Sequence, residues 1–247
     1  MTNTYYIFVH DIDIINLLEE RGEFKHLPNY QYVLLTKKEF NINSDKIIVS
    51  KNYELNIEDF NNYLQFTGWY CLGANKIPTT DYITLLEYDV RVDDLLDTKI
   101  NNIINGDNMY DCYGYAHLPK TNSFLNNDVF SNGLVDYLQS QQIDYNNIIT
   151  NKLNPEWIVT SNITIKTNVF LKLVRSNLFV NFLNYLTNTK MSGHFLERFI
   201  TVFLTLNNYN YGFIDDCVTH YAVDSHNTQN RNFVYQKFKQ EQLTNLL

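Results

Sequence analysis

The chain has 247 residues, of which 45% are hydrophobic and 15% aromatic, and its formal net charge is −8. So many aromatic residues allow a sizeable buried core and exclude an intrinsically disordered chain. The acidic balance argues against a nucleic-acid-binding protein, and also against a protein held on membranes by a polybasic surface.

Cysteine usage and the absence of targeting signals indicate a compartment. Cys71, Cys112 and Cys217 are far apart, odd in number and in no C-x-x-C pattern, which predicts neither a disulfide framework nor a zinc site. A reducing compartment is expected, so we predict a cytoplasmic protein. No apolar run is long enough to span a membrane, and the first ten residues lack the features of a signal peptide.

The first ninety residues alternate between strand and helix patterns. Continuous apolar runs predict strands, and apolar residues at helical spacing predict the helices between them. This order is typical of an α/β fold with a mainly parallel mixed sheet flanked by helices. The two uninterrupted runs, Thr4–Val9 and Tyr82–Leu86, should be neighbours or near-neighbours at its centre. The expected elements are strands Thr4–Val9, Tyr30–Leu35, Lys46–Val49 and Tyr82–Leu86, and helices Ile12–Leu18 and Asn56–Leu72.

The second half has a looser pattern. Expected there are helices Leu95–Ile104, Phe130–Gln139, Val169–Leu186 (one or two helices) and Gly193–Leu206, strands Cys112–His117 and Trp157–Lys166, the latter broken at Ser161-Asn162, and an extended stretch Tyr211–Ala222. The chain contains no repeat and no flexible linker. We therefore predict a single domain over residues 1–226, followed by a polar, partly helical extension over residues 227–247.

Two acids stand at the carboxyl end of the fourth predicted strand. Glu87 and Asp89 are two residues apart, so on an extended chain both side chains face the same way. Ligands of open α/β sheets bind outside the carboxyl ends of the strands, and hard divalent cations prefer carboxylates and substrate phosphates. The pair therefore predicts a metal–diphosphate site; the alternative is a strand that simply ends in solvated acids.

The order of elements and this acid pair resemble the GT-A fold of glycosyltransferases. In that fold a D-x-D motif, often degenerate, ends a central strand and holds Mn²⁺ or Mg²⁺ against a nucleotide-sugar diphosphate. The corresponding residues here are Glu87-Tyr88-Asp89. The segment GWYCLGANKIPTTDYITLLEYDV, residues 68–90, is also similar to uncharacterised glycosyltransferase-like proteins of large DNA viruses and bacteria. The resemblance extends over residues 4–226.

The resemblance implies a division of labour and roles for individual residues. Residues 1–94 would form the nucleotide-binding half, and residues 95–226 the acceptor half. Asp89 would bind the metal, with Glu87 as a weaker ligand. A late histidine often supplies a third ligand, for which we favour His226 over His220. Glu197, on a late helix, would be the general base.

Contacts to the nucleotide are expected from three further residues. His10 and Asp11 follow the first strand, where this fold meets the base and ribose, although Asp11 could instead cap the next helix. Arg91 is a candidate for contact with the diphosphate. Asp93-Asp94 form an alternative metal pair or a solvated helix start, and Asp215-Asp216 a metal pair or a turn.

The expected activity is transfer of a sugar from a UDP-, GDP- or dTDP-sugar to a hydroxyl of a glycan or glycoprotein, with Mn²⁺ or Mg²⁺. Two alternatives remain open. One is a non-catalytic GT-A-like domain that binds a sugar or a protein. The other is a different metal–phosphate enzyme such as a nucleotidyltransferase, which the absence of a phosphate-cradling glycine loop disfavours.

Overall fold

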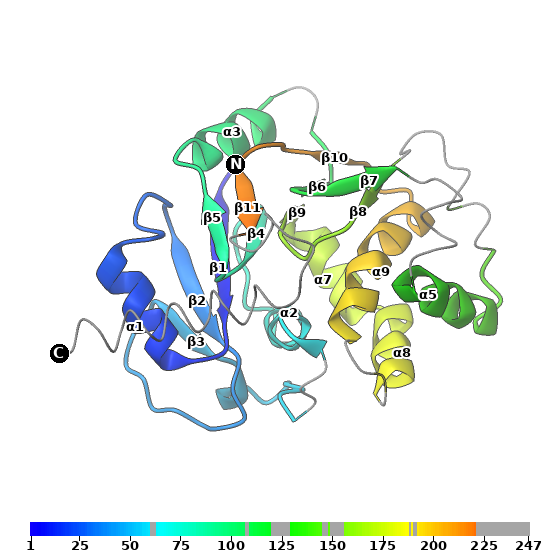
Figure 1. Cartoon of the computed structure of the whole chain (residues 1–247), viewed down its shortest axis with the longest axis horizontal. Coiled ribbons are helices and arrows are strands. Elements are labelled where there is room, and N and C mark those ends of the chain that lie inside the picture. Colours follow the sequence, from blue (N-terminus) through cyan, green and yellow to red (C-terminus); the bar gives the residue numbers. More distant parts are fainter. Residues whose placement is uncertain are drawn as a thin grey trace.

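A mixed β-sheet with helices on both faces forms the centre of the molecule (Figure 1). The computed structural model describes residues 1–59, 63–106, 109–119, 129–144, 148, 156–187, 189 and 192–220. Within these residues the main sheet has seven strands in the order β10-β6-β9-β4-β1-β2-β3, and β11-β5 and β7-β8 form two antiparallel pairs. The strands are β1 Asn3–Val9, β2 Tyr30–Leu34, β3 Ile47–Val49, β4 Tyr82–Glu87, β5 Val90–Val92, β6 Cys112–Gly114, β7 His117–Pro119, β8 Glu156–Ile158, β9 Ile163–Lys166, β10 Tyr211–Phe213 and β11 Val218–His220.

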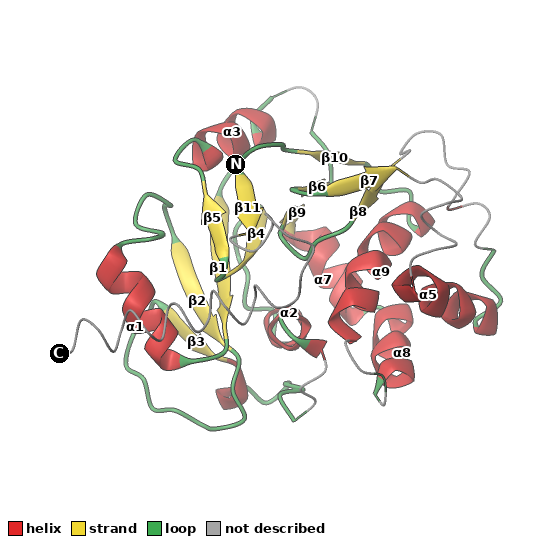
Figure 2. Cartoon of the chain, in the orientation of Figure 1, coloured by secondary structure: helices red, strands yellow, loops and turns green. Residues whose placement is uncertain are grey.

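The helices lie in two layers. Helices α1 and α3 cover one face of the sheet, and α2, α5, α7, α8 and α9 pack on the other, where Figure 2 shows the last four gathered at one side. Their bounds are α1 Ile12–Arg21, α2 Phe66–Ala74, α3 Leu96–Ile104, α5 Val129–Ser140, α7 Thr167–Arg175, α8 Asn177–Leu186 and α9 Ser192–Leu206, with a short 3₁₀ helix, η1, at Ser50–Asn52.

The predicted centre of the sheet is confirmed. β1 pairs in parallel with β4 on one side and with β2 on the other. Every residue of β4 is buried, as expected for a strand covered on both faces. The seven-stranded sheet is mainly parallel, because among its described strands only β9 runs antiparallel to its neighbours, β4 and β6.

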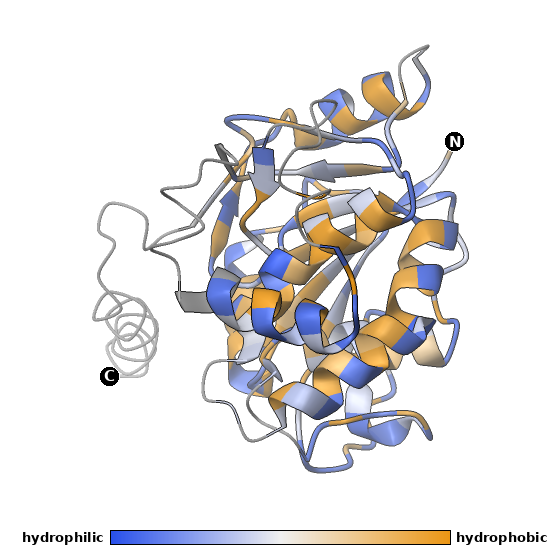
Figure 3. Cartoon of the chain, turned by 90° about the vertical axis from the view of Figure 1, so that its right-hand side faces the viewer, coloured by the Kyte–Doolittle hydropathy of each residue, from blue (hydrophilic) through white to orange (hydrophobic). Residues whose placement is uncertain are grey.

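Alternate residues of the central strands supply two separate cores. In β1, Tyr5 and Ile7 pack with α1 and α3, whereas Tyr6 and Phe8 pack with the larger helical layer. This follows from the two-residue period of a strand, whose successive side chains point to opposite faces. Figure 3, seen from the side of α5 and α8, shows hydrophobic and hydrophilic residues alternating along the helices of this layer, and its buried apolar residues belong to the larger core.

The predicted helix Asn56–Leu72 was wrong in its first half, because α2 begins only at Phe66. Asn56 does not cap it; its Oδ1 accepts the Glu58 N–H at 3.4 Å in a local turn. Leu64 has a φ of 51°, a value that a helix cannot contain. The apolar spacing that suggested a helix serves tertiary contacts instead, as the Tyr63 hydroxyl donates to the Leu183 carbonyl at 2.6 Å.

Helix α2 packs against the sheet through a glycine. A Cβ added at Gly68 would meet Phe8 of β1 at 2.6 Å and Leu35 at 2.7 Å. A larger residue would therefore force these side chains to move. The packing at Gly68 brings α2 onto the sheet near the carboxyl ends of β1 and β2, which form the edge where α/β folds bind their ligands.

Several elements of the second half are shorter than predicted. The expected strand Cys112–His117 is divided between β6 and β7, and the extended stretch Tyr211–Ala222 between β10 and β11. The break expected at Ser161-Asn162 is confirmed, since β8 ends at Ile158 and β9 begins at Ile163. The extension over residues 227–247, with its expected helix, lies outside the described residues, and the single-domain division stays a prediction.

Candidate active site

The carboxyl ends of β1 and β4 meet at one edge, because the two strands are parallel and in register. The Tyr88 N–H, just beyond β4, donates to the Phe8 carbonyl near the end of β1 at 3.2 Å. The rings of His10 and Tyr88 meet edge to face, with centroids 5.0 Å apart. His10 and Tyr88 of the acid motif are thus brought together at this edge.

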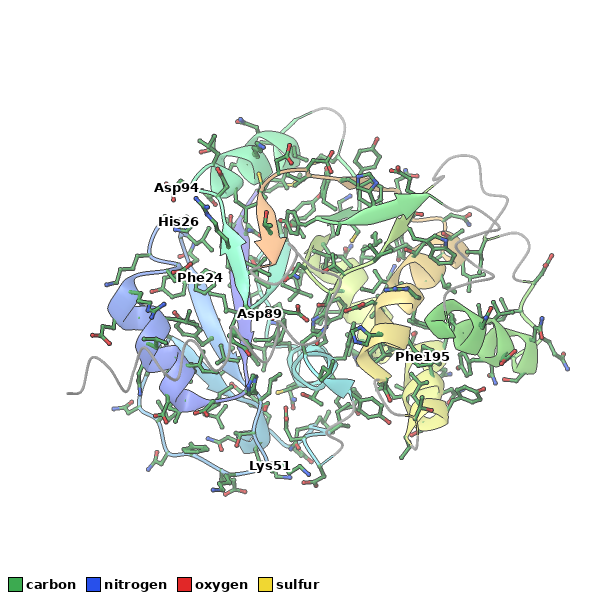
Figure 4. All side chains as sticks on the ribbon, in the orientation of Figure 1. Phe24, His26, Lys51, Asp89, Asp94 and Phe195 are labelled. Carbon is green, nitrogen blue, oxygen red and sulfur yellow. The ribbon has the colours of Figure 1, made fainter. Side chains whose placement is uncertain are left out.

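The two acids of the motif have different surroundings. Glu87 is the last residue of β4 and is 9% exposed. Its Oε1 accepts a hydrogen bond from the Ser161 hydroxyl at 3.0 Å, and its backbone N–H donates to Asn162 Oδ1 at 2.7 Å. Asp89 is half-buried in the turn between β4 and β5, near the middle of the molecule in Figure 4. Asp89 is therefore the acid with the more open position.

The late part of the chain returns to this motif. Strand β11 pairs antiparallel with β5, and His220 is the backbone partner of Val90, the residue after Asp89. His226 lies outside the described residues. The pairing supports a late histidine near the acids without ranking the two candidates.

The helix that carries Glu197 places it in a buried ionic group. Glu197 of α9 is 7% exposed, and its Oε2 accepts from Arg198 Nη1 at 3.1 Å. His194 Nδ1 lies 3.5 Å from the same oxygen. A buried carboxylate requires such partners, because an unpaired charge in the interior is costly.

A four-residue segment, residues 159–162, contacts Glu87 and also Arg198, the partner of Glu197. The Val159 carbonyl accepts from Arg198 Nη1 at 3.5 Å, and Ser161 and Asn162 bind Glu87. Two residues of extended chain span about 7 Å, so Arg198 and Glu87 are held at nearby points of one short segment. The structure thus links Glu87 to Arg198, the partner of Glu197, although the two residues are far apart in the sequence.

The remaining predicted residues have separate positions and partners. Asp11 is the N-cap of α1, and its side chain accepts the Asp13 N–H at 3.0 Å, which confirms the alternative that Asp11 caps this helix. Arg91 is exposed on β5. Asp93 accepts the Leu95 N–H at 2.8 Å before α3. Asp215-Asp216 form a turn between β10 and β11.

A divalent cation fits the acids of this edge only with help from a substrate. Among the described residues, no three His, Cys, Asp or Glu side chains gather in a way that could hold a metal ion. Mg²⁺ commonly binds one or two carboxylates together with substrate phosphates. Residues 88 and 89 form a turn, so the two-residue period of a strand, from which both acids were expected to face the same way, ends at Glu87. Asp89 and Glu87 would supply one or two carboxylates, and a late histidine would add a ligand.

Ser161 and Asn162 were missed as functional residues. The polar pair was read only as an interruption of an otherwise β-rich run. Its signal was present, because two polar residues inside such a run must find partners when they are buried; both are, at 2% and 1% exposure. Their partner is 74 or 75 positions away, which spacing alone does not reveal.

The three cysteines are free thiols, as predicted, and all are buried. Burial raises the pKa of the Cys71 thiol to about 12. A thiol with so high a pKa is a poor nucleophile, so Cys71 has a packing role.

Glu58 is a third buried acid, away from the motif and beside η1. It is 5% exposed, and its Oε1 has no hydrogen-bond partner among the described residues. The neighbouring hydroxyls of Ser50 and Thr67 donate to the carbonyls of Leu34 and Leu64. Burial raises the pKa of Glu58, and Ser50, Thr67 and Lys51 counter it only in part.

Glu58 should make the protein less stable as the pH rises. A carboxyl whose pKa is higher in the folded than in the unfolded chain contributes stability below its ordinary value of 4.5, and this is lost as the pH rises through the folded value. We expect Glu58→Gln to flatten that dependence and to add about 1 kcal/mol of stability at pH 7. Urea unfolding at pH 4 to 8 measures both, with the exposed Glu54→Gln as control. An unchanged pH dependence would contradict the assignment.

The fold has counterparts among solved structures. No protein-family model matches the chain, and no curated protein matches its sequence. The structure of WbbM, a bifunctional glycosyltransferase, aligns with 89% of this chain at a TM-score of 0.53 and 12% identity. The chain therefore has an α/β, GT-A-like fold with a mostly parallel sheet flanked by helices.

The chain covers different shares of the two solved structures. The chain spans about half the length of WbbM, since the alignment covers 45% of that protein. The galactosyltransferase LgtC was solved with donor and acceptor sugar analogues. Its alignment covers 86% of this chain and 73% of the LgtC chain, at a TM-score of 0.44 and 11% identity.

Within the described residues, no helix is long and apolar enough to cross a membrane.

Proposed function

We propose that this chain is a metal-dependent glycosyltransferase that moves a sugar from a nucleotide-diphosphate sugar to a hydroxyl of a glycan or glycoprotein. The observation that carries the proposal is the segment 159–162, which contacts Glu87 on one side and the partner of Glu197 on the other. The reaction needs a diphosphate site and an acceptor base close together. The GT-A-like fold and the position of Asp89 beyond β4 support the same reaction.

In this proposal Asp89 and Glu87 hold Mn²⁺ or Mg²⁺, with His226 as the favoured third ligand. The bound cation would neutralise charge on the leaving diphosphate. His10, beside Tyr88, and Asp11 lie at the edge where the base and ribose of the donor would bind, and Arg91 could approach the diphosphate.

The chain's own residues would then act on the acceptor. The acceptor oxygen attacks the anomeric carbon while the bond from that carbon to the diphosphate oxygen breaks. Glu197 takes the proton of the acceptor hydroxyl if the reaction inverts the anomeric centre. Arg198 and His194 orient the Glu197 carboxylate, and the buried position of the group keeps out water, which would otherwise hydrolyse the donor.

The proposal predicts release of nucleoside diphosphate from one class of donor. A panel of UDP-, GDP- and dTDP-sugars is incubated with the protein and Mn²⁺ or Mg²⁺, and free diphosphate is measured. Release should be slow in water and faster with a glycan or glycoprotein acceptor, and chelation of the metal should stop it. If no donor binds or turns over, a non-catalytic GT-A-like binding domain becomes the better description.

The three free, buried thiols support a reducing compartment, so we propose a cytoplasmic location for the enzyme. We also propose that the chain is related to the glycosyltransferase-like proteins of large DNA viruses and bacteria.

A further inference from the structure

The residues Ser161 and Asn162 take over the pairing of β4 where the backbone ladder ends. β9 pairs antiparallel with β4, and the last ladder pair is Leu85 with Ile163. Two residues further on, the same register puts Ser161 opposite Glu87. At that point, hydrogen bonds with the side chains of Ser161 and Asn162 replace the backbone hydrogen bonds between β4 and β9. An ordinary sheet needs no such side-chain bonds.

This pair engages one carboxylate oxygen and the backbone N–H of Glu87. The Ser161 hydroxyl donates to Oε1 at 3.0 Å, and the Glu87 N–H donates to Asn162 Oδ1 at 2.7 Å. The three residues are all at most 9% exposed. A hydrogen bond to a buried carboxylate is stronger than one in water and restricts the carboxylate's rotation.

The orientation of Asn162 is itself fixed by Thr160. Asn162 Nδ2 donates to the Thr160 hydroxyl oxygen at 3.0 Å, and the Asn162 backbone N–H donates to the same oxygen at 3.1 Å. With its amino group committed to Thr160, the amide presents its oxygen to the Glu87 N–H. The three residues form a preorganised bracket for one acid, which we call the TSN bracket (Thr160, Ser161 and Asn162).

We propose that Ser161 and Asn162 are positioning residues that fix the Glu87 carboxylate for the cation and diphosphate, an inference that rests on the proposed function. The groups that orient metal ligands commonly change metal affinity by about 10- to 100-fold when they are removed. The bracket also accounts for glutamate at the first motif position, because its longer side chain is held by Ser161 from the facing segment.

The same bracket joins the two halves of the site. Its neighbour Val159 accepts a hydrogen bond from Arg198, which in turn binds Glu197. The orientation of Glu87 and that of the Glu197 group therefore depend on one continuous piece of chain. Loss of the Ser161 hydroxyl should act first on the metal and donor, since Ser161 contacts Glu87 directly.

A double-mutant cycle between Ser161 and Glu87 tests the assignment. The variants Ser161→Ala, Glu87→Ala and the double variant are titrated calorimetrically with UDP and GDP in the presence of Mn²⁺. We expect Ser161→Ala to weaken binding by about 10-fold in the wild-type background. In the Glu87→Ala background it should change affinity by less than about twofold, because residues that act through one another are not additive.

Two further variants separate positioning from stability. Ser161→Thr retains the hydroxyl and should recover most of the affinity. Ser176→Ala removes the cap of α8, whose oxygen accepts the Phe179 N–H at 3.1 Å, and should lower the melting temperature while leaving nucleotide affinity unchanged. Thermal unfolding of the same cycle without ligand reports the Ser161–Glu87 bond independently of any activity.

The outcomes distinguish this inference from the function on which it rests. Wild-type binding with an unaltered Ser161→Ala affinity would overturn the positioning role and leave the proposed function standing. An equal loss in both backgrounds would assign Ser161 a structural role and also overturn it. If wild type binds no nucleotide while unfolding still shows coupling, the proposed function fails, and the bracket is then only a structural feature of the sheet.

Discussion

Asp89→Ala should abolish the metal-dependent binding of a nucleoside diphosphate, with a loss greater than about 100-fold. Residues that merely support a metal ligand cost about 10- to 100-fold when removed, so a ligand itself should cost more. Asp89 lies half-buried in a turn between β4 and β5, so its removal leaves both hydrophobic cores untouched. The melting temperature should therefore change little. Calorimetric titration of UDP and GDP with Mn²⁺ gives the affinity.

A matched control lies beyond the other end of β5 (Figure 4). Asp94 belongs to the alternative acid pair; its side chain is 89% exposed and lies 3.8 Å from His26 Nδ1. Asp94→Ala removes the same charge from the same segment and should leave affinity within about twofold, since isolated surface charges contribute little. A loss in Asp94→Ala with none in Asp89→Ala would move the metal to Asp93-Asp94.

The central sheet could be predicted because its signal is local. Thr4–Val9 and Tyr82–Leu86 are apolar without interruption, and only a strand covered on both faces accommodates such a run. The order of strands and helices then limited the topology to a few choices. The structure confirmed that these strands are neighbours and that the sheet is mainly parallel.

Predictions failed where distant contacts override local spacing. Residues 56–65 have helical apolar spacing, yet Leu64 takes a positive φ and Tyr63 bonds to the far end of α8. Propensity is a weak indicator in such a case, because tertiary contacts outweigh a few tenths of a kcal/mol per residue. The burial of Glu58 beside η1 was hidden for the same reason.

Only part of the candidate site could be predicted from the sequence. Glu87 and Asp89 could be recognised because they are close together after a strong strand. The bond of Glu87 to Ser161 joins residues 74 positions apart, and the approach of β11 to β5 depends on how the whole sheet is ordered. No local pattern encodes such pairings, so their discovery required the fold.

Glu197→Gln should retain donor affinity and lose turnover by about 10²- to 10⁴-fold, the usual contribution of a general base. Glutamine keeps the shape of the side chain and one oxygen that can accept from Arg198 Nη1, now 3.1 Å from Oε2. What it loses is the ability to take a proton from the acceptor hydroxyl. Single-turnover rates with saturating donor and acceptor measure the chemical step directly.

The ion pair of Glu197 offers a competing role, which is only to hold the Arg198 guanidinium beside the Val159 carbonyl. In that case Arg198→Lys should reproduce the loss of turnover and weaken donor binding too, because lysine cannot replace the planar fork of arginine. Glu19→Gln is the control: this glutamate on α1 pairs with Lys46 at 3.7 Å on the opposite face of the sheet, and its loss should leave turnover unchanged. Undiminished turnover in Glu197→Gln would keep the enzyme and remove Glu197 from its mechanism, as a retaining reaction would require.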